Sequence, residues 1–82
     1  MIRVIFFARL REQLGCGQLD MELTQPATVT SLLEQLLVDH PQWQSALAGD
    51  KVLVVVNQVI ANDQTPVSSD AEVAFFPPVT GG

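Results

Sequence analysis

One stretch of the chain, residues 28–40, carries the apolar spacing of an amphipathic helix and limits what the rest can fold into. Its apolar residues recur at i, i+3, i+4, i+7 and i+8: Val29, Leu32, Leu33, Leu36 and Leu37. Thr28 is a good N-cap, because its hydroxyl accepts from an unpaired backbone N–H of the first turn. His40 precedes Pro41, a position that disfavours helical backbone, so the helix is expected to end there. Such a helix needs a second layer to cover its stripe.

The segments on both sides of this helix have the alternation or the β-branched character of strands. The predicted strands are Ile2–Leu10, Leu19–Leu23, Lys51–Val56, Val59–Ala61 and Ala71–Phe76. The first two are predicted to pair as a hairpin with a long loop around Gly15 and Gly17. The first and last strands are the most apolar, so we expect them side by side in the centre of a sheet.

The 82 residues are enough for one domain. The elements predict an α+β fold, in which one main helix covers one face of a small mixed sheet. A short second helical turn is expected at residues 42–48, with Trp43 and Leu47 pointing inward. A pocket of roughly several hundred Å³ would hollow out the only core, so the chain is expected to work with a partner rather than as a self-contained enzyme.

The charge balance argues against polyanionic partners. Nine acidic residues outweigh four basic ones and give a net charge of −5, so we expect no nucleic-acid and no membrane partner. The apolar opening segment is interrupted by Arg3 and Arg9, is too short to span a bilayer and does not resemble a signal peptide. We therefore expect a cytoplasmic protein.

Side chains that commonly carry catalysis are scarce. Cys16 would need a nearby base or a helix N-terminus to become a nucleophile, and the alternative is a small residue in a turn. His40, the only histidine, has no spaced partner for a metal site and is placed to interact favourably with a helix C-terminus. We expect the chain to bind no metal and no cofactor.

The C-terminal pair Gly81-Gly82 is not explained by a purely structural domain. A terminal glycine presents its carboxylate without a Cβ, and two glycines give a thin backbone that can enter a narrow site on another protein. Pro77-Pro78 favours an extended approach. A carboxylate must be activated before a nucleophile can attack it, for instance by adenylation, and no ATP site is predicted, so activation requires a partner enzyme. The alternative interpretation is a frayed terminus.

The outward face of the first predicted strand indicates a docking surface. Phe7 lies there with Arg3, Arg9 and Arg11, which are three of the four basic residues. An exposed aromatic side chain ringed by arginines is typical of an interface hot spot. The alternative is that another segment covers Phe7.

The last strand contributes aromatic residues to the same face. Alternation from Val73 predicts Phe75 inside and Phe76 outside, but a bulge before Pro77 would reverse them, so both stay candidates. The residues predicted to bind a partner are Phe7, Arg11, Val59, Phe75, Phe76 and Pro77.

Three segments of the chain carry a family resemblance. They are the opening MIRVIFFARLRE (residues 1–12), the central Val56-Asn57-Gln58 and the ending DAEVAFFPPVTGG (residues 70–82). With these segments the chain resembles the small subunit of molybdopterin synthases, the MoaD type. The ending differs from that of the thiamine-pathway sulfur carrier, because two phenylalanines and two prolines precede its last four residues. Residues 25–49 match the family only in their pattern of apolar and polar residues.

The resemblance implies a ubiquitin-like β-grasp domain over residues 1–76 and an extended tail over residues 77–82. It implies that an adenylating enzyme of the MoeB type uses ATP to activate Gly82 and that a persulfide donor converts it to a thiocarboxylate. Gly81 would be the spacer that lets the tail enter a large subunit of the MoaE type. There the sulfur would pass to cyclic pyranopterin monophosphate, in a heterotetramer whose catalytic side chains belong to the large subunit.

Two alternatives stay open. The chain could be a sulfur carrier for another pathway, such as thiamine synthesis or tRNA thiolation, or a ubiquitin-like modifier joined through Gly82 to lysines of target proteins. Both share the fold and the activation chemistry, so the identity of the partner separates them.

Overall fold

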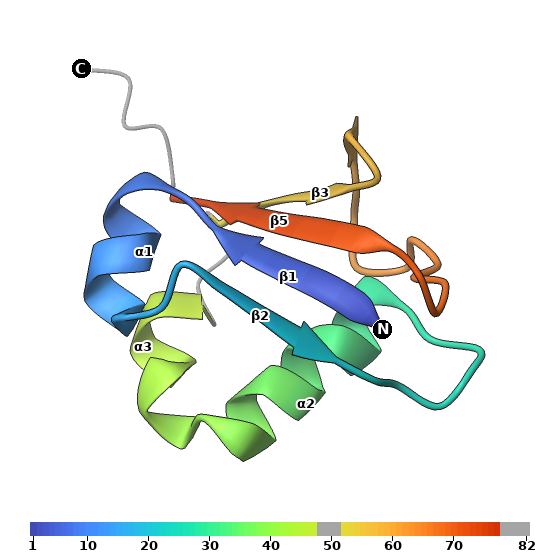
Figure 1. Cartoon of the computed structure of the whole chain (residues 1–82), viewed down its shortest axis with the longest axis horizontal. Helices are drawn as coiled ribbons and strands as arrows, with labels where there is room; N and C mark the ends of the chain where they lie inside the picture. Colours follow the sequence, from blue (N-terminus) through green and yellow to red (C-terminus); the bar gives the residue numbers. More distant parts are fainter. Residues whose placement is uncertain (48–51, 78–82) are drawn as a thin grey trace.

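The structure is a computed structural model that describes residues 1–47 and 52–77. Within these ranges five strands form one mixed sheet in the order β2-β1-β5-β3-β4 (Figure 1). At its centre β1 (Ile2–Phe6) runs parallel to β5 (Glu72–Phe76). The antiparallel strands β2 (Gln18–Met21), β3 (Leu53–Val56) and β4 (Val59–Ile60) complete the sheet. The prediction that the first and last strands lie side by side is confirmed.

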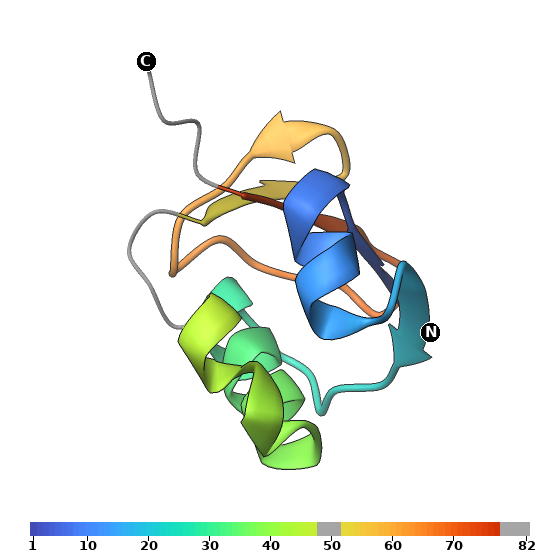
Figure 2. The same ribbon diagram turned by 90° about the vertical axis from the view of Figure 1, so that its left-hand side faces the viewer.

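The helices that follow β2 cover one face of the sheet. Helix α2 (Val29–Asp39) is followed by a 3-10 turn η1 (Pro41–Trp43) and a short helix α3 (Gln44–Leu47), on the same side as α2 (Figures 1 and 2). The predicted α+β class and the β-grasp arrangement, a mixed sheet laid on one main helix, are confirmed. No helix within residues 1–47 and 52–77 is long and apolar enough to cross a membrane.

The predicted start and end of α2 are confirmed, and local chemistry accounts for both. The Thr28 hydroxyl accepts from the Ser31 backbone N–H, and the Ser31 hydroxyl accepts from the Thr28 backbone N–H, each at 3.3 Å. This reciprocal pair is a capping box, which provides acceptors for two backbone N–H groups at the start of the helix. At the other end His40 leaves helical geometry immediately before Pro41.

The core lies between α2 and the inner face of the sheet. Leu32 and Leu36 of the helix are buried in one cluster with the inward residues of the two central strands: Ile2, Val4, Phe6, Val73 and Phe75. Trp43 meets the Phe6 ring edge-on at 5.3 Å, and Leu47 is buried as well, so both point inward as predicted.

The prediction of a first strand extending to Leu10 is wrong, because β1 ends at Phe6 and residues Ala8–Leu14 form helix α1. The segment is rich in strong helix formers, and its apolar side chains at Leu10 and Leu14 are four residues apart, the spacing of one helix face. Leu10 is buried and Leu14 packs against the core. Gly15 ends the helix in the left-handed region at φ 67°, which glycine adopts without steric cost.

The connections within the two antiparallel strand pairs β1–β2 and β3–β4 differ in length. The loop between β1 and β2 contains α1, although the two strands pair antiparallel as expected. The turn between β3 and β4 consists of Asn57 and Gln58, both at positive φ, 48° and 70°. Two successive residues at positive φ characterise the hairpin turn whose twist matches that of the flanking strands.

Candidate functional site

The face of the sheet opposite α2 carries two rows of apolar side chains. Along one row Ile5, Ala74, Val55 and Ile60 are cross-strand neighbours on β1, β5, β3 and β4. Along the next row Leu53 is paired with Phe76, and Phe7 stacks on Phe76. In the part of the chain that the structure describes, no helix covers these rows (Figures 1 and 2). An uncovered apolar sheet face in a small domain is typical of a binding surface.

Phe7 and Phe76 form an aromatic pair at one end of this face. Their ring centroids are 4.6 Å apart and their planes differ by 2°, and Phe7 remains 40% exposed. The backbone holds the pair in place, because the Phe7 N–H donates to the Phe75 carbonyl at 3.1 Å. The prediction that Phe7 is exposed on the outer face is therefore confirmed, and its neighbour there is Phe76.

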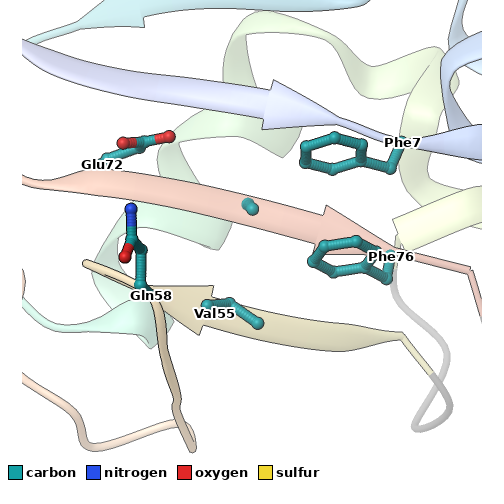
Figure 3. A pocket seen from close by; sticks show the side chains of 6 residues that line it. Phe7, Val55, Gln58, Glu72 and Phe76 are labelled. Carbon is teal, nitrogen blue, oxygen red and sulfur yellow. The ribbon is translucent and has the colours of Figure 1, made fainter.

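A shallow groove of about 270 Å³ starts at this aromatic pair and runs along β5 on the outer face of the sheet. Figure 3 shows Phe7 and Phe76 at one end, Val55 along the side, and Glu72 and Gln58 at the other end. Ala74 lines the groove between the two ends. The groove therefore changes along its length from aromatic to polar.

The polar end of the outer face is a short row of charges. Arg3 is paired in register with Asp20 on one side and with Glu72 on the other, and all three are exposed. None of them forms an ion pair within the described residues, where the only one joins the N-terminus to Asp70. The Glu72 backbone is fixed, because its N–H donates to the Asn57 side-chain oxygen at 2.9 Å.

The prediction that Phe75 binds a partner is wrong. Its side chain is 1% exposed and stacks on Phe6 in the core, with ring centroids 5.6 Å apart. The strand keeps its regular alternation up to Phe76, so no bulge reverses the two phenylalanines. Phe76 is the outward member of the pair.

Val59 is exposed on the edge strand β4 but does not line the groove. It is paired with Val56, whereas its neighbour Ile60 is paired with Val55. Because side chains alternate between the two faces of a strand, Ile60 shares the outer face with Val55. Sequence reasoning missed Ile60 and Val55, although alternation counted from the buried Val56 would have indicated Val55.

The predicted ring of arginines around Phe7 is also wrong, because Arg9 and Arg11 belong to α1 and not to the first strand. The Arg11 side chain lies against Gly17, where an added Cβ would be 3.0 Å from its Nε. Arg11 is exposed and does not line the groove. Of the three arginines, only Arg3 lies on the strand itself.

The two conventional catalytic candidates have structural partners. The Cys16 thiol donates to the Gln18 carbonyl at 3.4 Å, and the residue follows the C-terminus of α1 rather than a helix N-terminus. His40 stacks on Trp43 with ring centroids 3.9 Å apart. Among residues 1–47 and 52–77, no three His, Cys, Asp or Glu side chains are grouped closely enough to hold a metal ion.

The C-terminal segment begins beside the groove. Pro77 is half-buried and directly follows Phe76. Gly81 and Gly82, predicted to carry the reactive terminus, lie outside the described residues. The described part therefore places the aromatic end of the groove next to the start of the segment that leads to the terminus.

Comparison with known proteins gives consistent matches over the whole chain. A sequence model of the ThiS family matches residues 4–82. The molybdopterin synthase sulfur carrier subunit of Escherichia coli (strain K12) is 40% identical over 82 residues, and that of Haemophilus influenzae is 39% identical over 82 residues, each match covering all of both chains. Among solved structures, SAMP1 from Haloferax volcanii superposes with a TM-score of 0.87 and 30% identity, covering 99% of this chain and 98% of that chain.

Proposed function

The chain belongs to the ThiS family, and from that membership we propose that it is the sulfur carrier subunit of a molybdopterin synthase. The observation that carries the proposal is the 40% identity to a molybdopterin synthase sulfur carrier subunit, over the full length of both chains. The proposed protein is cytoplasmic and acts as the non-catalytic subunit of a sulfurtransferase. It binds no cofactor of its own.

The proposed reactive group is the carboxylate of Gly82. An adenylating partner of the MoeB type joins it to the AMP moiety of ATP and releases pyrophosphate. The outer sulfur of a persulfide donor then attacks the activated carbonyl and displaces AMP, which forms an acyl disulfide. A thiol reductant cleaves its S–S bond, and the terminus becomes a thiocarboxylate. Gly81 keeps the approach to this group narrow, because it has no side chain.

The proposed receiver of the sulfur is bound to a large subunit of the MoaE type. There two thiocarboxylates in succession each donate one sulfur to cyclic pyranopterin monophosphate, which becomes molybdopterin with its two dithiolene sulfurs, and hydrolysis returns each carrier to a free carboxylate. Because the core of the carrier is filled by its own side chains, the substrate pocket and the catalytic side chains are assigned to the large subunit.

The proposed contact with the large subunit is centred on the outer face of the sheet. Phe7 and Phe76 supply exposed aromatic area there, and Pro77 leads from this face towards the terminus. Arg11 and Val59 lie outside the groove and are assigned to the rim of the contact. Because this contact lies beside the start of the tail, binding of the domain to the large subunit also brings the tail and its terminus close to the large subunit.

Reconstitution tests the proposal directly. The chain is incubated with the adenylating enzyme, ATP, a persulfide donor and a thiol reductant, and its intact mass is measured. The expected product has one oxygen replaced by sulfur, and with the large subunit it converts cyclic pyranopterin monophosphate to molybdopterin. Persistent absence of the thiocarboxylate with an activating enzyme that modifies the E. coli carrier would refute the proposal.

A second candidate function is protein modification, favoured by the similarity to SAMP1, a small archaeal modifier protein. In this case the activated Gly82 would form an isopeptide bond with a lysine of a target protein. Expression of the tagged chain in cells then yields a ladder of covalent adducts that survive denaturation. A protein that is only a sulfur carrier yields the thiocarboxylate and no ladder. A pull-down then identifies the pathway: capture of the large subunit indicates molybdopterin synthesis, and capture of a different sulfur acceptor indicates another pathway.

A further inference from the structure

The groove on the outer face combines an apolar floor with a carboxylate at one end. Phe7 and Phe76 form its aromatic end, and Glu72 and Gln58 lie at its far end (Figure 3). Ala74 and Val55 line it between these ends. Because Ala74 and Glu72 are two residues apart on one face of β5, their Cα atoms are roughly 7 Å apart along the strand. A long aliphatic side chain with a charged tip matches these dimensions and this polarity.

We propose that this groove receives a lysine or arginine side chain from the large subunit, with its aliphatic stem on Ala74 and Val55 and its cationic tip at Glu72. The inference rests on the proposed function and adds the chemistry of the contact. It assigns Glu72 a role in orienting the partner. Because the groove is aromatic at one end and acidic at the other, a basic side chain fits it in only one direction.

Charge complementarity favours a basic occupant over an apolar one. A partner that covers the groove also removes water from the Glu72 carboxylate, and a carboxylate left unpaired in an interface is strongly unfavourable. Within the described residues no cationic group lies in ion-pair contact with Glu72, although Arg3 is its neighbour in register. A cation from the partner supplies the missing charge. The aromatic end adds a further favourable contact, because the stems of basic side chains pack well on apolar surface.

The test compares three variants in calorimetric titrations with a MoaE-type large subunit that binds the wild-type chain. Glu72→Gln keeps the shape of the groove and removes its charge. Glu34→Gln makes the same change on the solvent side of α2 and serves as the control. We expect the first to weaken binding by about three- to tenfold at low salt, with the difference shrinking as salt is raised. The control is expected to bind like wild type.

A third variant, Arg3→Gln, tests whether the positive charge that pairs with Glu72 comes from the partner or from Arg3 of the same chain. If the partner supplies the charge, removal of Arg3 leaves binding unchanged or tightens it. If binding weakens to the same extent as in Glu72→Gln, Arg3 provides the counter-charge and the inference is wrong. Thermal unfolding of each variant reports whether its fold is intact.

The possible failures are distinguishable. If the wild-type chain binds the large subunit and Glu72→Gln binds equally well at every salt concentration, the proposal of a basic side chain in the groove is wrong. The occupant is then apolar. Self-association of the free chain that is lost in Ala74→Leu, which fills the groove, would indicate a second copy as the occupant and also overturn the proposal. If no large subunit binds the wild-type chain, the proposed function fails and this inference fails with it.

Discussion

The ring of Phe7 lies flat against the ring of Phe76 from the neighbouring strand, with centroids 4.6 Å apart and planes within 2° of each other. Phe7 directly follows β1 and Phe76 ends β5, so the pair depends on the parallel pairing of these two central strands. Exposed aromatic pairs of this kind are characteristic anchors of protein interfaces. The contact thus links the formation of the sheet to the proposed docking of the partner.

Replacing Phe7 with alanine is expected to weaken binding to the large subunit by about 2 kcal/mol or more, which is roughly 30-fold in Kd. The change removes exposed apolar area and half of the aromatic pair, while the core remains intact. Calorimetry of the purified subunits measures the effect. Val38→Ala, a change at an exposed apolar residue of α2 on the other side of the molecule, is the matched control. A neutral Phe7→Ala result would remove Phe7 from the hot spot.

Deleting Gly81 and Gly82 is expected to abolish thiocarboxylate formation and to leave folding unchanged within about 0.5 kcal/mol. The reason is that the buried core of the described residues extends no further than Phe75. Intact-mass analysis after reconstitution measures the first effect, and urea unfolding measures the second. Retained sulfur transfer would contradict the assignment of Gly82, and a lost unfolding transition would show that the two residues serve the fold.

Replacing Thr28 with alanine is expected to lower the free energy of unfolding by about 1 kcal/mol, because the capping box at the start of α2 is lost. The affinity for the partner is expected to stay the same, since α2 lies on the other face of the sheet. The matched control is Thr24→Ala, at an exposed residue before the helix. Equal stability of the two variants in urea would mean that the cap contributes nothing.

The two glycines that flank Cys16 are expected to respond differently to alanine. Gly15 has a φ of 67° with open space around it, so Gly15→Ala strains the backbone and lowers stability by about 1 kcal/mol. At Gly17 the added Cβ instead meets the Arg11 side chain at 3.0 Å. That side chain is flexible, so Gly17→Ala is expected to displace Arg11 with little loss of stability. Urea unfolding and the NMR shift of the Arg11 Nε–H separate the two effects, and equal destabilisation would contradict this division.

Where the signal was local, the prediction from sequence was correct. Thr28 and Pro41 bracket α2 through capping and proline geometry, which act within one turn. Alternation placed Phe75 inside and Phe76 outside, because the period of a strand is independent of what lies beside it. The error at Ala8–Leu14 arose where alternation and helix spacing were both present in a short segment, and burial of Leu10 beside Leu14 favoured the helix.

From the sequence alone, the residues that face outward could be predicted for each strand separately, but not which residues of different strands are neighbours. The sequence placed Phe7 outward, left Phe75 and Phe76 as alternatives for the outward position on the last strand, and marked the terminal glycines as unusual. Only the tertiary structure decided that Phe76 is the outward residue, that its ring stacks on Phe7, and that Glu72, Ala74 and Val55 line one groove with the two rings. The physical reason is that cross-strand neighbours are set by strand order and register, which depend on burying the opposite face against α2.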